Sequence, residues 1–318
     1  MLIISTIVMV LAVAGGYGTS VWLEHRLGGQ IERLPQALPD DAHRPAAAPD
    51  ESMNVLLLGS DKRADGSVAG QRSDTMMVVH VAADRKSVGV VGIPRDSWVN
   101  VPGYGPAKIN AAFARGGPAL AVETIENLTD TRIDHVAVID WEGFKDLTDA
   151  LGGVTVRVHE TVTDGYTGRV WTAGKHHVDG EDALAYVRQR AGLPGGDFDR
   201  IKRQQSFLRA LSRKVLRTQT FVNPPRLYDV LDSVTRSLAV DEGWSSGELR
   251  RFAWSLRSLR SEDVAFTTVP LRGTGMEGDQ SVVYLDRQAG ADLWDAVRDG
   301  TVVDWIEQAD AGLNANVN

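Results

Sequence analysis

The chain has 318 residues, which is enough for one large α/β domain or two small ones. Its hydrophobic fraction of 43% and charged fraction of 24% are ordinary for a globular protein with a packed core. The net charge of −8 argues against general nucleic-acid binding, because that function needs a basic surface to neutralise phosphates. The sequence contains no cysteine, which excludes disulfides, thiolate metal ligands and a cysteine nucleophile.

The first 23 residues carry no charge and are mostly apolar. A helix of that length spans roughly 30 Å, the thickness of a bilayer hydrocarbon core. We therefore predict one transmembrane helix at 1–23, with a cleaved signal peptide as the alternative. Its flank lacks Lys and Arg, so charge cannot orient the helix, and we expect the natural start to lie upstream.

Residues 24–52 contain four prolines, an alanine run and mixed charges, which is typical of a linker that holds a domain off the membrane. The folded domain is predicted to begin at Met53 and to run to the end, 53–318. Apolar runs and period-two patterns predict strands at 53–60, 75–81, 87–93, 135–139, 154–158, 264–269 and 281–285. Helical patterns with caps and breakers cover 109–115, 119–127, 141–151, 179–187, 198–216, 225–238, 246–259 and 287–297. This alternation predicts a single three-layer α/β/α domain, and the hairpin between the second and third strands makes its sheet mixed.

Charged residues gather at the ends of the first three strands. Asp61 follows the first strand, Arg72 and Asp74 surround the start of the second, and Arg95 and Asp96 follow the third. A hairpin of about eight residues per strand returns its ends to one edge of the sheet, about 25 Å from the turn. We therefore expect these five residues to lie together, whereas Asp84 in the turn is excluded.

Two carboxylates beside arginines suit a Mg²⁺ ion that shares phosphate oxygens, because Mg²⁺ takes one or two carboxylates and completes its octahedron with water and phosphate. Arginines neutralise the remaining phosphate charge through paired hydrogen bonds. The alternative is a set of ordinary ion pairs at strand ends.

More arginines follow in two later segments. Arg188 and Arg190 are two positions apart and would point the same way in an extended chain. Arg200 and Gln204 lie one turn apart on the long helix at 198–216, and Asp197 or Asp199 is expected to cap that helix.

Six motifs in this order resemble the LytR–CpsA–Psr family of cell-wall glycopolymer transferases. They are GSD (59–61), RSDTMM (72–77), IPRDSWV (93–99), KIN (108–110), GEDALAYVRQR (180–190) and DFDRIKRQQ (197–205). The resemblance covers about residues 53–216, the motif-bearing core, and is vague in the last hundred residues.

The resemblance implies a membrane-anchored, single-pass protein with an extracytoplasmic catalytic domain. It implies that Asp61 and Asp74 hold Mg²⁺, and that Arg72, Arg95, Arg188, Arg190, Arg200 and Gln204 hold the pyrophosphate of a polyprenyl-pyrophosphate-linked glycopolymer. The catalytic residues would be Asp74, Arg95, Arg188 and Arg190, and the acceptor would be peptidoglycan.

The expected reaction is attack by a peptidoglycan sugar hydroxyl on the phosphorus that carries the glycan, with polyprenyl phosphate leaving. Asp96 and Asp199 are candidate bases, although each also has a structural role as a turn residue or cap. Apolar residues around the long helix are expected to line a cavity for the prenyl chain. The alternatives are a non-catalytic polyprenyl-phosphate-binding or regulatory envelope protein and a lipid pyrophosphatase.

Overall fold

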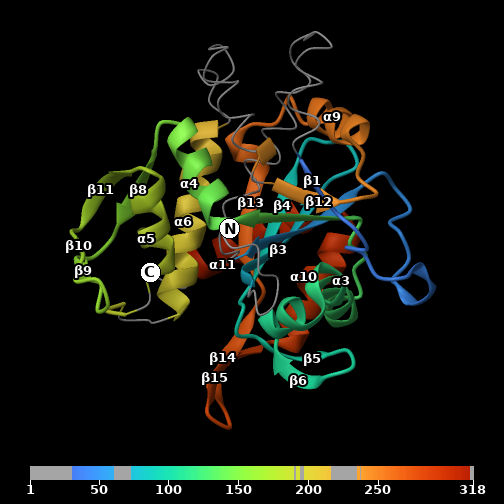
Figure 1. The fold of residues 1–318 in the computed structure, drawn as a ribbon, viewed down its shortest axis with the longest axis horizontal. Helices are drawn as coiled ribbons and strands as arrows, with labels where there is room; N and C mark the ends of the chain where they lie inside the picture. The colour runs from blue at the N-terminus through green and yellow to red at the C-terminus, as the bar shows by residue number, and fades with distance from the viewer. Residues whose placement is uncertain are drawn as a thin grey trace. The chain divides into compact units, whose positions relative to one another are not determined.

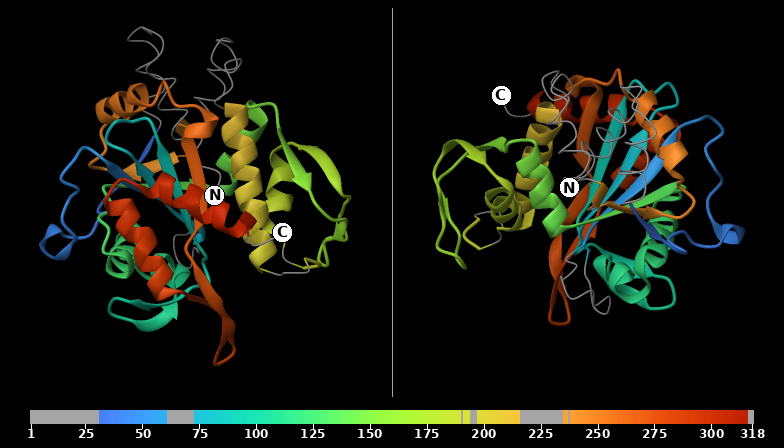
Figure 2. Two further views of the ribbon diagram at one scale, coloured as in Figure 1. Left: turned by 180° about the vertical axis from the view of Figure 1, so that it is seen from behind. Right: turned by 45° about the horizontal axis from the view of Figure 1, so that its top comes forward.

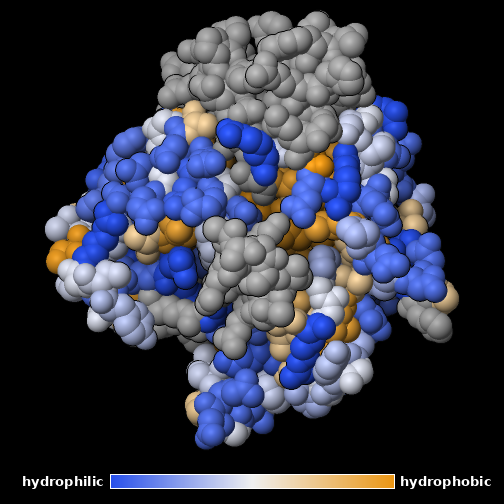
Figure 3. All heavy atoms as spheres, in the orientation of Figure 1, coloured by the Kyte–Doolittle hydropathy of each residue, from blue (hydrophilic) through white to orange (hydrophobic). Residues whose placement is uncertain are grey.

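The computed structural model describes residues 31–60, 73–189, 191–193, 197–215, 235–236 and 238–315. The chain divides into two compact units that alternate along the sequence. Unit 1 comprises Met1–Glu32, Ile139–Leu238 and Ser246–Arg257, and unit 2 comprises Arg33–Val138, Ala239–Ser245 and Ser258–Asn318. On the face seen in Figure 3, most of the described surface residues are hydrophilic.

A seven-stranded sheet forms the centre of unit 2, with the strand order β1-β12-β7-β2-β3-β4-β13 (Figure 1). The strands are β1 (Glu32–Leu34), β2 (Met53–Ser60), β3 (Ser73–Val81), β4 (Val88–Ile93), β7 (His135–Asp140), β12 (Leu238–Asp241) and β13 (Val264–Thr268). β2, β3 and β4 are antiparallel, whereas β13 runs parallel to β4. The mixed α/β fold expected from the sequence is confirmed, while the three-layer arrangement stays a prediction.

The hairpin between β3 and β4 explains how the site residues are placed. Met76 pairs with Ile93 and Val81 pairs with Val88, so the start of β3 and the end of β4 share one edge of the sheet. Asp84 lies in the turn at the opposite end, where its Oδ1 accepts a hydrogen bond from the backbone N–H of Lys86 at 2.9 Å. The predicted position of Asp84, in the turn far from the start of β3, is confirmed.

Three helices cover one face of this sheet, namely α3 (Asn110–Thr129), α10 (Arg287–Arg298) and α11 (Val302–Ala315) (Figure 2). Side chains such as Leu56 and Val78 on the sheet and Ile125 and Leu293 on the helices are fully buried in one core. Gly89 on β4 allows α11 to approach closely, because a Cβ there would lie 2.3 Å from a methyl carbon of Val302.

Helix α3 joins two segments that the sequence predicts as separate helices. Gly116 and Gly117 have non-helical backbone angles, with φ of +64° at Gly117, and Pro118 follows as a first-turn residue. The predicted break is therefore present as a kink within one element.

Two hairpins of unit 2 were only partly expected. They are β5 (Trp98–Val101) with β6 (Gly105–Lys108), and β14 (Leu271–Glu277) with β15 (Gln280–Leu285). Only β15 was predicted as a strand. The first hairpin consists of four-residue strands, and β14 alternates small and polar residues, so neither gave a strong hydrophobic pattern.

Unit 1 contains the other arginine motifs. Its helices are α4 (Trp141–Ala150), α5 (Gly180–Arg188), α6 (Asp197–Val215) and α9 (Ser246–Ser255), and its hairpins pair β8 (Val154–Val158) with β11 (Gly174–Val178) and β9 (Val162–Thr163) with β10 (Val170–Trp171). Phe144 of α4 stacks on Phe207 of α6 with ring centroids 5.7 Å apart. Asp179 caps α5 by accepting from the N–H of Asp182, and Gly180 has no room for a Cβ against the α4 backbone.

The helix predicted at 225–238 falls mostly outside the described residues, and Leu238 belongs instead to strand β12.

Part of the segment predicted as a linker is folded. β1 forms an edge of the sheet, and Arg44 is buried against Glu126 of α3, with its Nη2 donating to Glu126 Oε1 at 2.8 Å. The prolines and mixed charges predicted a linker. A buried ion pair between positions 44 and 126 leaves no local pattern in the sequence, so the sequence could not show that this segment is folded.

The remaining N-terminal prediction, a transmembrane helix at 1–23, lies outside the described residues. In the part of the chain that the structure describes, none of the helices is both long and apolar enough to span a bilayer.

Candidate functional site

The candidate site of unit 2 lies at the sheet edge where β3 begins and β4 ends. Asp74 is the second residue of β3, and Arg95 lies in a turn two residues beyond β4. The β3–β4 register brings both positions to this edge, as predicted. The side chain of Asp74 and all of Asp61 and Arg72 fall outside the described residues, so their assigned roles remain predictions.

Asp96 connects Arg95 to the KIN motif. Its Oδ1 accepts from Lys108 Nζ at 3.0 Å, and its Oδ2 lies 3.4 Å from Arg95 Nε. The side chains of Arg95, Asp96 and Lys108 are only 13%, 11% and 21% exposed. Partial burial strengthens such contacts relative to a fully exposed ion pair. Asp96, predicted as a possible base, is thus engaged by two cations and holds Arg95 in place.

The backbone reinforces this arrangement. The N–H of Asn110 donates to the carbonyl of Arg95 at 3.2 Å, and the N–H of Ile109 donates to the carbonyl of Ser97 at 2.8 Å. Two motifs that are separated in sequence therefore form one rigid corner, which the spacing of the motifs alone did not reveal.

In unit 1, the candidate residues meet where α5 ends and α6 begins. The guanidinium of Arg188 lies over the ring of Trp141 at 5.1 Å, a cation–π contact with the first residue of α4. Gln204 on α6 donates through Nε2 to the carbonyl of Val187 at 3.3 Å. Arg200 is 6% exposed, and it lies one helical turn before Gln204 as predicted.

The sequence left open an extended chain at Arg188 and Arg190. At Arg188 this expectation is wrong, because the residue is helical. Arg188 is the last residue of α5, and Gln189 leaves the helix with ψ of 132°. Arg190 lies outside the described residues, so the relative directions of the two side chains stay a prediction. The long helix begins at Asp197, which places Asp199 within its first turn.

Arg203 is a residue whose importance the sequence did not reveal. Its Nη1 donates to Gln189 Oε1 at 2.6 Å, and its guanidinium lies 4.7 Å from the ring centre of Tyr186. Burial lowers the pKa of Arg203, while Tyr186 and Asp199 oppose that shift. Since Gln189 and Tyr186 belong to one motif and Arg203 to the other, this buried arginine joins the two.

Arg203 also borders a basic groove in unit 1 of about 680 Å³. Arg157, beside Val158 on β8, and Arg209 and Arg213 on α6 contribute further guanidinium groups, while Glu160 and Asp199 contribute carboxylates. The arginine excess of the composition is thus partly concentrated on one face of α6.

The described residues offer few clustered side chains of the kinds that bind metal ions. They contain no group of three or more His, Asp or Glu side chains that could hold a metal ion. A Mg²⁺ ion needs only one or two protein carboxylates when phosphate and water complete its shell. The carboxylate oxygens predicted at Asp61 and Asp74 are chemically suited to Mg²⁺, and the backbone of β3 holds Asp74 beside Arg95 at the sheet edge.

Comparison with known proteins places this architecture in a class. The solved structure of TagT bound to LIIa-WTA superposes with a TM-score of 0.63 at 26% identity, covering 83% of this chain and 98% of that chain. Relatives include the cell wall biosynthesis protein LcpA of Corynebacterium glutamicum, 35% identical over 283 residues. The polyisoprenyl-teichoic acid–peptidoglycan teichoic acid transferase TagU of Enterococcus faecalis is 36% identical over 244 residues. The fold and its motifs thus define a class of bacterial cell-wall proteins.

The chain belongs to the LytR_cpsA_psr family, whose model matches residues 32–298. The match to LcpA covers 75% of this chain and 54% of LcpA, and the match to TagU covers 75% and 76%. The chain therefore spans about half the length of LcpA. The family suggested by the six motifs is confirmed, and the match reaches the C-terminal part, where the motif resemblance was vague.

Proposed function

We propose that the chain is a Mg²⁺-dependent phosphotransferase that moves a phospho-glycopolymer from a polyprenyl-pyrophosphate carrier to a peptidoglycan sugar hydroxyl. The observation that carries this proposal is that Arg95, held by its ion pair with Asp96, lies at the end of the sheet where β3 begins, with Asp74 as the second residue of that strand. The name of the TagU relative, a transferase from a polyisoprenyl carrier to peptidoglycan, supports the same chemistry.

In the proposed reaction, the acceptor hydroxyl oxygen forms a bond to the glycan-bearing phosphorus. The bridging P–O bond breaks, polyprenyl phosphate leaves with the electron pair, and the hydroxyl proton passes to a base or to water. Phosphoryl transfer depends mainly on positioning and charge neutralisation. A Mg²⁺ ion held by Asp61 and Asp74 would supply Lewis-acid neutralisation of phosphate charge.

The chain's own arginines would perform the remaining neutralisation. Arg95 is fixed by Asp96, and Arg188 is fixed over Trp141, so each guanidinium is oriented before substrate arrives. Preorganised donors stabilise developing charge without reorganisation at the moment of reaction. Arg72, Arg190, Arg200 and Gln204 are assigned to the same pyrophosphate by the family motifs.

We further propose a membrane location, with residues 1–23 as the anchor, the catalytic domain outside the membrane and an apolar cavity near α6 for the prenyl chain. The family membership supports this location.

The deciding experiment is transfer from a synthetic polyprenyl-pyrophosphate-linked glycan to peptidoglycan, with Mg²⁺ or EDTA present. Asp74→Ala is expected to abolish transfer without changing the melting temperature, and Asp84→Ala, at the far end of the same hairpin, is the matched control. Release of glycan phosphate into water would identify a lipid pyrophosphatase. Donor binding without any product would identify a non-catalytic or regulatory protein.

A further inference from the structure

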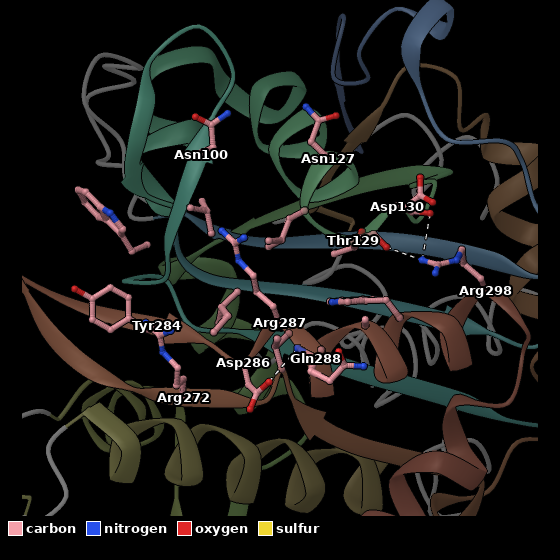
Figure 4. A pocket seen from close by; sticks show the side chains of 18 residues that line it. Asn100, Asn127, Thr129, Asp130, Arg272, Tyr284, Asp286, Arg287, Gln288 and Arg298 are labelled. Carbon is pink, nitrogen blue, oxygen red and sulfur yellow. Dashed lines mark hydrogen bonds between the residues drawn. The ribbon is translucent and has the colours of Figure 1, made fainter.

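Unit 2 contains a groove of about 970 Å³, and only Trp98 and Val99 of its lining belong to one of the six motifs. It lies between β5, the C-terminal end of α3, the end of β15 and the first turns of α10 (Figure 4). Arg287 extends into it from α10, and Asn100 and Asn127 lie across from it on β5 and α3 (Figure 4).

The three side chains just named have unused hydrogen-bonding capacity. Within the described part of the chain, no hydrogen bond or ion pair engages the side chains of Asn100, Asn127 or Arg287, and all three are exposed. Two other polar side chains of the groove, Arg298 and Asp286, already have partners. Arg298 donates to the carbonyl of Thr129, and Asp286 caps α10 by accepting two backbone N–H groups.

Aromatic rings complete the lining. Trp98 and Tyr284 are half-buried at the groove. The Tyr284 hydroxyl donates to Glu277 Oε1 at 2.7 Å, which fixes the orientation of its ring. An aromatic face packs against the apolar C–H face of a pyranose ring, while amides and a guanidinium bond to hydroxyl and acetamido groups. Three arginines and two aspartates line this groove, so its net charge is small and an uncharged ligand fits it.

The backbone connects the lining of the groove to the corner that holds Arg95. Ser97 forms a β-bridge with Val283, and the N–H of Val283 donates to the carbonyl of Asp96 at 2.9 Å. The chain then enters β5 at Trp98. Trp98, which lines the groove, therefore follows the candidate phosphate-binding residue Arg95 by only three positions in the sequence.

We propose that this groove binds the acceptor, as a chain of uncharged, N-acetylated pyranose sugars, and directs one hydroxyl toward the edge of the sheet. The proposal rests on the proposed transferase function. Asn100, Asn127 and Arg287 hold the sugar substituents, and Trp98 supports a ring face, while Tyr284, with the Arg272 guanidinium over its ring, borders the site.

Binding is tested first, without donor, by calorimetry with N-acetylglucosamine oligomers of four to six units added to the full chain. Wild type is expected to bind, and Asn100→Ala and Arg287→Ala are each expected to weaken binding about tenfold, as loss of one or two hydrogen bonds predicts. Arg251→Ala, an exposed residue on α9, is the matched control and should bind as wild type does. Wild type that binds no oligomer at millimolar concentration, or variants that bind equally well, would overturn the proposal.

Transfer kinetics provide the second arm. The two groove variants are expected to raise the acceptor KM about tenfold and to leave the donor KM unchanged. Transfer with an unaltered acceptor KM would overturn the groove proposal and leave the transferase function standing. Oligomer binding that the variants weaken, with no transfer to any acceptor, would support the groove and remove the transferase function.

Discussion

Replacing Asp96 by asparagine separates two roles for that residue. The carboxylate contacts Lys108 Nζ at 3.0 Å and Arg95 Nε at 3.4 Å, so the structure makes it a positioning group for Arg95. Asp96→Asn preserves the shape but removes the charge between two cations. The backbone bond from Asn110 to the Arg95 carbonyl would keep the turn itself in place.

The expected loss follows from these contacts. The hydrogen bond from Lys108 Nζ to Asp96 joins two charged groups and contributes about 1.5–3 kcal/mol, and the Arg95–Asp96 ion pair adds to it. These side chains are only 11–21% exposed, so little is lost to solvent screening. If the loss falls on Arg95 in the transition state, transfer slows about ten- to a hundredfold. Lys108→Met should also slow transfer. Asp96 would lose its contact with Lys108 and could then move together with Arg95 away from its position.

The assay is the transfer rate across pH for wild type, Asp96→Asn and Lys108→Met, with the melting temperature as a control for folding. A positioning role predicts pH profiles of unchanged shape and an increased donor KM in both variants. The reasoning would be refuted if Asp96→Asn removed the acidic limb of the profile while Lys108→Met behaved as wild type. That result would make Asp96 the general base, for which a loss of about 10²–10⁴ is typical.

Three other predictions concern stability and phosphate binding. Burial lowers the pKa of His80 to about 4 from an ordinary value of 6.5, so the free energy of unfolding should fall by up to roughly 3 kcal/mol as the pH drops from about 6.5 toward 4. His80→Asn should flatten the dependence of the melting temperature on pH across that window. An unchanged slope in the variant would contradict this prediction. Arg44→Ala should destabilise the fold by about 3–5 kcal/mol in urea titrations, because it leaves the buried Glu126 carboxylate without its arginine partner. The double change Arg44→Met with Glu126→Leu should restore most of the loss. A single variant as stable as wild type would show that this segment is not integral to the fold. Arg188→Lys keeps the charge but loses the planar group over Trp141, so transfer should slow about ten- to a hundredfold at an unchanged melting temperature, and a wild-type rate would exclude a paired phosphate contact.

The sequence predicted what depends on local periodicity and motif order. The strands β2, β3 and β4, the hairpin between β3 and β4, the break after Arg115, and helices α4, α5 and α6 all appear close to their predicted limits. Each has a strong apolar pattern or clear caps and breakers. The placement of Asp74 and Arg95 at one edge followed from strand length alone.

Features that depend on contacts between distant residues were not predictable. Strand β12 is only four residues long. Its Asp241 is buried, and the carboxylate accepts a hydrogen bond from the N–H of Val136 and lies 3.1 Å from His135 Nδ1. The bracing of Arg95 by Asp96 and Lys108 and the clasp of Arg203 on Gln189 likewise join separate motifs. One sequence shows which side chains are present but not which of them meet.

The parallel pairing of β13 with β4 has a consequence for how the chain acquires its structure. Val88 pairs with Val264, so the intervening residues, including all the described elements of unit 1, are synthesised before β4 gains its second neighbour. Helices α10 and α11, which cover one face of the sheet, follow later still. Until then β4 presents an unpaired backbone edge, and the part of the sheet face that α3 does not cover remains in contact with water. We expect folding to be slow because contacts of such long range close late, and a chain shortened after unit 1 should aggregate rather than retain a stable sheet.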